Sequence, residues 1–141
     1  MPEFKLTIND VKTGKSYKKV ISDEDSDTFR GKKIKDKVDG AGIGLKGYEF
    51  EITGGSDNAG FPMRGDIEGS ARKRPLISKG PGVKIKRKGM RTRKRLAGNQ
   101  LNHLTSQINL KVVKYGAEEL VKVFGKEEKS AEKAAEEAEA K

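Results

Sequence analysis

The sequence predicts a mainly β protein: a small β-barrel of short strands with Gly/Pro-rich loops, followed by a short C-terminal helix and an acidic tail. Several short segments alternate apolar and polar residues, and many of the 17 glycines lie between them. No long helical pattern precedes residue 117. We therefore expect a β-barrel domain over residues 1–116 that includes a basic segment over 72–98, a packing helix over 117–125, and a frayed helix or disordered tail over 126–141.

The individual elements follow from local patterns. Alternation predicts strands over residues 3–8, 16–21, 48–53, 75–78, 83–87 and 108–114. The turn residues between the first two strands predict a hairpin. Residues 29–38 fit either a short helix or a strand and turn. Leu120, Val121 and Phe124 are spaced as on one helix face, whereas the Ala/Glu/Lys tail has no bulky apolar residue to bury.

Positive charge is concentrated in one part of the chain. The composition is 33% hydrophobic and 37% charged, with a net charge of +10. The segment from Arg72 to Arg95 contains twelve Lys or Arg residues and no Asp or Glu. Close like charges repel and destabilise a compact state, so folding alone does not explain this segment. It indicates a surface for a polyanion, and the repulsion predicts partial disorder when no polyanion is bound.

The candidate nucleic-acid-binding residues are the basic side chains in and next to this segment, because Arg binds phosphate bidentately and Lys supplies a mobile positive charge. For each of them the alternative is an ordinary solvated surface charge. The set is Arg64, Arg72, Lys73, Arg74, Lys79, Lys84, Lys86, Arg87, Lys88, Arg91, Arg93, Lys94 and Arg95.

The composition argues against other classes of function. There is no cysteine and His103 is the single histidine, which excludes disulfides and the usual zinc sites. The acidic cluster at residues 23–27 lacks the glycine and distal glutamate of a calcium loop. The Gly-rich stretch 39–47 does not fit a dinucleotide motif, and the glycine-rich loop 54–63 has no Lys-Ser/Thr pair to close a P-loop. No apolar run reaches the roughly 20 residues of a membrane helix. We expect no enzyme activity, catalytic residue, metal, cofactor, small-molecule substrate or membrane partner.

A glycine-rich loop precedes the basic segment. Its successive amides could bind an anion, but its spacing favours a glycine-dependent turn with Phe61 and Met63 in the core. Its distinctive residues are Gly54, Gly55, Asp57, Gly60, Pro62 and Met63.

This loop also carries a family resemblance. The stretch ITGGSDNAGFPM, residues 52–63, resembles the signature of the archaeal and eukaryotic S-six-e family of small-subunit ribosomal proteins. The flanking GLKGYEFEITGG and RPLISKGPGVKIKRKGMRTRKRLAGN extend the similarity, which covers about residues 1–116. The archaeal form is the closer likeness, because the acidic tail differs from the long basic helix and serine-rich phosphorylated tail of eukaryotic members.

The resemblance implies a structural constituent of the small ribosomal subunit. Such a protein binds ribosomal RNA, neighbours other ribosomal proteins, supports subunit assembly and translation, and is cytoplasmic. Composition alone leaves open a DNA-binding regulator or chromatin protein on a similar small barrel, because phosphate attracts the same basic residues in DNA and RNA.

Overall fold

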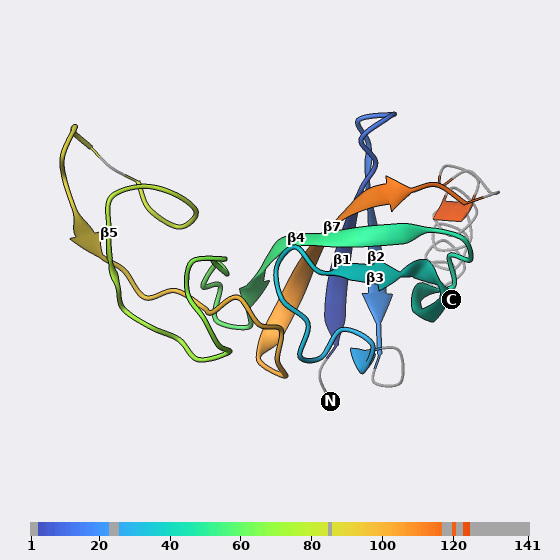
Figure 1. The fold of residues 1–141 in the computed structure, drawn as a ribbon, viewed down its shortest axis with the longest axis horizontal. Coiled ribbons are helices and arrows are strands. Elements are labelled where there is room, and N and C mark those ends of the chain that lie inside the picture. The colour runs from blue at the N-terminus through green and yellow to red at the C-terminus, as the bar shows by residue number, and fades with distance from the viewer. Residues whose placement is uncertain (1–2, 23–25, 85, 117–119, 121–122, 125–141) are drawn as a thin grey trace, which may run out of the picture.

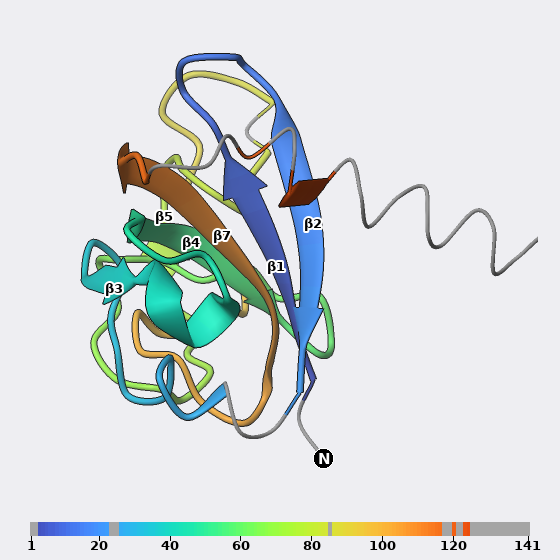
Figure 2. The same ribbon diagram turned by 90° about the vertical axis from the view of Figure 1, so that its right-hand side faces the viewer.

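A five-stranded mixed sheet forms the body of the protein (Figures 1 and 2). The computed structural model describes residues 3–22, 26–84, 86–116, 120, 123 and 124. The strands are β1 (Phe4–Asn9), β2 (Ser16–Ile21), β3 (Lys37–Asp39), β4 (Glu49–Asp57) and β7 (Thr105–Lys114), in the spatial order β2-β1-β7-β4-β3. β1 runs parallel to β7, and the other neighbouring strands are antiparallel.

One face of this sheet builds the main core. Apolar residues alternate along β1, β4 and β7, so successive side chains point to opposite faces and the apolar ones gather on one side. The residues with no exposed surface include Phe4, Ile8, Phe50, Ile52, Ile108 and Leu110. The residues of the other face, such as Thr7, Gln107 and Asn109, are partly or fully exposed and are hydrogen-bonded to one another.

The expected mainly β fold is confirmed, but no closed barrel is found. The strands described form an open sheet, with β2 at one edge and β3 at the other. β3 has three residues, and β5 (Leu76–Ile77) pairs with β6 (Thr92–Arg93) in a separate two-stranded sheet. β5 and β6 therefore do not extend the main sheet.

The strand boundaries differ most from the predictions in the basic segment. Strands predicted over 3–8, 16–21, 48–53, 75–78 and 108–114 are present, with β4 and β7 longer than expected. The strand predicted over 83–87 is wrong for the four of these residues that the structure describes. The partner of β5 is instead β6, with Leu76 opposite Arg93 and Ile77 opposite Thr92.

Two further segments contain turns and a short 3-10 helix. Residues 29–36 form turns that lead into β3, so the strand-and-turn alternative holds. The Gly-rich stretch contains a 3-10 helix, η1 (Gly40–Ile43), which ends at Gly44 with a positive φ of 78°. Gly40 packs so closely that a Cβ there would lie 2.4 Å from the carbonyl oxygen of Leu45.

The predicted C-terminal helix and tail lie largely outside the described residues. Of residues 117–125, the structure describes Leu120, Val123 and Phe124. Leu120 and Phe124 are buried in the main core, and the ring of Phe124 stacks on Tyr17 of β2 with 5.0 Å between ring centroids. Among the described residues, no helix has the length and apolar character needed to cross a membrane.

A long loop-rich lobe connects β4 to β7. We call residues 58–104 the basic lobe; its far part extends away from the sheet (Figure 1). It has a small core of its own, formed by Ile67, Ile77 and Leu96 with Val83 packed against them. Next to this core, Lys73 and Leu96 exchange two backbone hydrogen bonds of 2.9 Å each. The basic segment therefore folds back on itself around buried apolar residues.

The two adjacent glycines at the end of β4 allow a matched stability test. A Cβ at Gly55 would lie 2.3 Å from the carbonyl oxygen of Gln107 and 3.2 Å from the sulfur of Met63, whereas a Cβ at Gly54 meets nothing within 4 Å. We expect Gly55→Ala to lower the free energy of unfolding by about 1–3 kcal/mol, the usual cost of overpacking. Gly54→Ala should change it by less than about 0.5 kcal/mol. Urea denaturation of both variants measures this, and equal effects would contradict the packing described.

Candidate nucleic-acid interface

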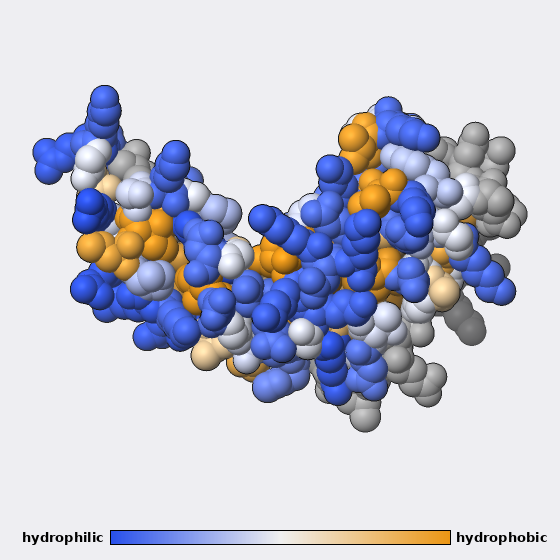
Figure 3. Space-filling view, in the orientation of Figure 1, coloured by the Kyte–Doolittle hydropathy of each residue, from blue (hydrophilic) through white to orange (hydrophobic). Residues whose placement is uncertain are grey.

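The basic lobe carries an excess of positive charge larger than that of the whole chain. Residues 58–104 contain thirteen Lys or Arg residues and two acidic residues, Asp66 and Glu68, while the chain has a net charge of +10. In the space-filling view, hydrophilic residues cover much of the lobe, with hydrophobic ones gathered between them (Figure 3). The exposed large apolar residues of the lobe are Leu76 and Met90.

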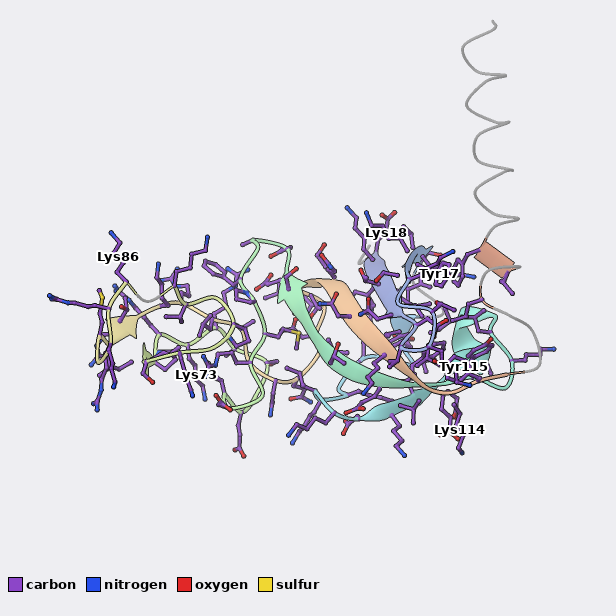
Figure 4. The ribbon with its side chains drawn as sticks, turned by 90° about the horizontal axis from the view of Figure 1, so that it is seen from above. Tyr17, Lys18, Lys73, Lys86, Lys114 and Tyr115 are labelled. Atoms are coloured by element: carbon purple, nitrogen blue, oxygen red, sulfur yellow. The ribbon has the colours of Figure 1, made fainter. Side chains whose placement is uncertain are left out.

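Eleven of the thirteen predicted basic residues are exposed and are in no ion pair with another described residue. They are distributed along the lobe; Lys86 lies near its far end and Lys73 closer to the sheet (Figure 4). The ammonium of Lys73 reaches the backbone carbonyl of Glu68 at 3.1 Å, which leaves its charge unneutralised. These eleven are Lys73, Arg74, Lys79, Lys84, Lys86, Arg87, Lys88, Arg91, Arg93, Lys94 and Arg95.

Arg64 differs from these eleven because its side chain is only 12% exposed. Its Nη1 donates to the backbone carbonyl of Lys79 at 3.0 Å, and its Nη2 donates to Asp66 Oδ2 at 2.5 Å. Gly80 has a φ of +120°, and a Cβ there would lie 2.6 Å from Nη1. Arg64 thus joins two loops of the lobe, and its guanidinium already has partners inside the protein.

Arg72 is also engaged within the protein. Its Nε donates to Asp57 Oδ2 at 2.5 Å, and its Nη2 donates to Asn58 Oδ1 at 2.9 Å. The guanidinium lies over the ring of Phe61, 5.2 Å from the ring centroid. Asn58 and Phe61 were not among the predicted site residues, because nothing in their spacing along the chain connects them to Arg72.

Asp57 is the acidic partner in this pair, and its side chain is 5% exposed. The hydrogen bond from Arg72 lowers the pKa of Asp57 below its ordinary value of 3.8, whereas burial of the carboxyl raises it. The positive charge of Arg72 and the amides of Ala59 and Asn58 lower this pKa further. The same hydrogen bond raises the pKa of Arg72. The other oxygen of Asp57, Oδ1, is buried without a hydrogen-bond partner among the described residues, so Arg72 is the main group that stabilises the carboxylate.

The remaining signature residues form a tight turn at the root of the lobe. The amide of Gly60, with a φ of +79°, donates to the carbonyl of Asp57 at 2.8 Å, and the amide of Asp57 donates to the carbonyl of Phe61 at 2.9 Å. Pro62 forms an isolated bridge with Ser56. Met63 is buried in the main core as expected, whereas Phe61 is half-buried outside it, so the prediction of a core position is wrong for Phe61. The structure thus shows the glycine-dependent turn rather than an open anion-binding loop.

The described residues contain no group of three or more acidic or histidine side chains placed to hold a metal ion. Asp23, Glu24 and Asp25 of the acidic cluster lie outside them. The lobe therefore contributes positive charge and a shaped surface. It is attached to the sheet through the tight turn of the signature residues, which we call the signature turn.

Comparison with known proteins identifies the family. The family model described as "Ribosomal protein S6e" matches residues 4–125. The chain belongs to the ribosomal protein S6e family. It is 46% identical over 114 residues to "Small ribosomal subunit protein eS6" of Methanococcus maripaludis, covering 81% of this chain and 90% of that protein. The proteins of the same name from Methanocaldococcus jannaschii and Archaeoglobus fulgidus are 46% and 42% identical, covering 90% and 89% of this chain and 95% and 98% of theirs.

Membership of the S6e family confirms two expectations drawn from the sequence. The resemblance to the archaeal form holds, since these relatives are archaeal proteins of similar length. The chain is a structural ribosomal protein and not an enzyme, because that is the character of the family.

The pair formed by Asp57 and Arg72 gives a pH-dependent prediction. Since the pKa of Asp57 is lowered in the folded protein, the pair stabilises the fold above about pH 3.8, and this contribution is lost as the pH falls through the lowered pKa. Arg72→Gln should raise the pKa of Asp57, because burial then acts without the hydrogen bond and charge of the guanidinium. Arg74→Gln, at an exposed neighbour without an ion pair to a described residue, should leave it unchanged. Titration of the Asp57 carboxyl carbon by NMR measures this, and an ordinary pKa in the unsubstituted protein would contradict the pairing.

Proposed function

We propose that this S6e-family chain binds small-subunit ribosomal RNA through the basic lobe and so takes part in the assembly of that subunit and in translation. The observation that carries the proposal is the set of eleven exposed cations without an ionic partner among the described residues. Its location is the small ribosomal subunit, which is cytoplasmic in archaea. Its partners are ribosomal RNA and, in the assembled subunit, other ribosomal proteins.

Binding through the lobe works by charge neutralisation and shape. Each phosphate that meets a Lys or Arg releases condensed counterions, which favours association. The eleven exposed cations lie along a lobe that has its own core, which holds part of its backbone in place before the RNA arrives. Arg64 and Arg72 have a different role, because their guanidinium groups already hold the lobe together.

Reading of base edges has a small part in this mechanism. A double-stranded RNA helix has a deep, narrow major groove that side chains cannot read, so recognition rests on phosphates, 2′-hydroxyls and shape. Phe61 is the one Phe, Tyr or Trp in the lobe, which leaves little for stacking along a single strand. The lobe therefore fits a folded RNA surface better than an extended strand.

The salt dependence of RNA binding tests the proposal. If about six phosphates are contacted, the logarithm of affinity should fall with the logarithm of salt concentration at a slope of roughly −4 to −5. The triple variant Lys84→Gln, Lys86→Gln, Arg87→Gln should make this slope shallower by about 2 to 3 units, since each lost phosphate contact removes roughly 0.7–0.9. Filter binding to a fragment of small-subunit ribosomal RNA measures both slopes.

The matched control removes the same number of charges from the exposed side of the sheet, with Lys5→Gln, Lys18→Gln and Lys111→Gln. This control should leave the slope nearly unchanged. Equal losses in the two triple variants, or binding without salt dependence, would contradict the lobe as the interface. Tighter binding to duplex DNA than to the ribosomal RNA fragment at the same salt concentration would favour the DNA-binding alternative.

A further inference from the structure

We propose that Arg72, supported by Phe61, forms a stacking platform for one unpaired RNA base at the root of the basic lobe. This inference rests on the RNA binding proposed above, and adds a contact with a base to contacts with phosphates. It starts from the difference between Arg72 and the eleven exposed cations of the lobe.

The plane of the Arg72 guanidinium is fixed by contacts on three sides. Nε donates to Asp57 Oδ2 at 2.5 Å, Nη2 donates to Asn58 Oδ1 at 2.9 Å, and the guanidinium carbon lies over the ring of Phe61, 5.2 Å from its centroid. Asp57 is itself buried at the end of β4, and the amide of Asn58 donates to the carbonyl of Leu104 at 2.8 Å. The guanidinium is thus positioned by groups that belong to the sheet and its first turn, which limits the orientations open to it.

Part of this guanidinium remains available to a ligand. The Arg72 side chain is 32% exposed, and Nη1 donates no hydrogen bond to a described residue. Because the ring of Phe61 lies on one side of the guanidinium and acceptors occupy Nε and Nη2, the surface left for a ligand is the side away from Phe61 and the Nη1 edge. An arginine held in this way presents a flat, oriented group rather than a mobile charge.

The local charge favours a base over a phosphate at this position. Asp57 neutralises much of the Arg72 charge, so a phosphate placed here would gain less than at the eleven unpaired cations. A base has a flat face and no net charge, and in RNA recognition unpaired bases stack on aromatic rings and on Arg guanidinium planes. The fixed plane also removes most of the ordering cost that a free arginine would pay on binding.

The base must be unpaired, and the neighbouring residues suit such a ligand. Bases inside a helix have both faces covered by their neighbours in the stack, so a bulged or terminal base is the one that can reach the platform. Lys73 and Arg74 follow Arg72 directly in the chain, and both are exposed. They can hold the phosphates on either side of the bulge while its base lies on Arg72.

The test compares two short RNA hairpins that differ at one position. One has a single bulged adenosine in its stem, and the other has an abasic residue at the same position, so the two carry the same number of phosphates. The unsubstituted protein should bind the adenosine hairpin roughly five- to a hundredfold more tightly, the range that stacking of one base supports. This comparison needs no variant, so it does not depend on whether a substituted lobe folds.

A conservative variant then assigns the effect to Arg72. Arg72→Lys keeps the positive charge and can still pair with Asp57, but it has no planar group; it should bring the ratio of the two affinities close to one and leave the salt slope unchanged. Arg74→Lys is the control and should keep the full ratio. A merely structural role for Arg72 would lower the affinities for both hairpins equally, and that result would overturn the proposal.

The remaining outcomes separate this inference from the function on which it rests. Equal affinities of the unsubstituted protein for the two hairpins, with the expected salt slope, would overturn the platform and leave RNA binding by the lobe intact. If Arg72→Gln also made that slope shallower, the position would belong to a phosphate, which likewise overturns the platform. Salt-independent binding, or no binding to either hairpin, would overturn both proposals.

Discussion

Repulsion among the cations of the basic lobe is the constraint on which the rest of this structure depends. Thirteen Lys or Arg residues share residues 58–104 with two acidic ones, and such a density of like charge opposes a compact state. A few specific contacts within the lobe and at its junction with the sheet offset this repulsion. Ile67, Ile77 and Leu96 form its apolar core, Arg64 joins two of its loops, and Arg72 pairs with Asp57 at its root.

The signature turn joins this lobe to a sheet that has no such charge problem. The sheet body has an extensive apolar core, and its last strand before the lobe, β4, ends at the buried Asp57. Gly55 allows close packing on β7, Gly60 provides the left-handed backbone of the turn, and Met63 returns the chain to the main core. The family signature is thus explained by its structural role: it connects a stable body to a charged lobe and supplies the carboxylate that fixes Arg72. The RNA binding that we propose is then a property of the lobe that this connection presents.

The sequence predicted the parts of the fold that depend on local patterns. Alternation located β1, β2, β4 and β7, and the spacing of the signature favoured a turn with Met63 in the core. The sequence did not predict the open sheet. Whether the edge strands pair and close the sheet into a barrel depends on the long-range pairing of β1 with β7 and on the short length of β3. It also placed a strand over 83–87, where alternating Val83 and lysines resemble a strand, whereas pairing with β5 is made by Thr92 and Arg93. In the basic segment, charge could be counted from the sequence, but the contacts from Asp57, Asn58 and Ile67 could not, because these residues precede the segment and meet it only in the folded chain.

Hydrogen exchange in the free protein tests most directly whether these contacts hold the lobe together without RNA. The amides of Lys73 and Leu96 donate reciprocal 2.9 Å hydrogen bonds beside the lobe's core, while the amide of Lys94 donates no hydrogen bond to a described residue. We predict that the amides of Lys73 and Leu96 exchange far more slowly than that of Lys94 at low salt concentration, where repulsion is least screened. Equally fast exchange at all three amides in the absence of RNA would contradict this account and would mean that the lobe orders only when its charge is neutralised.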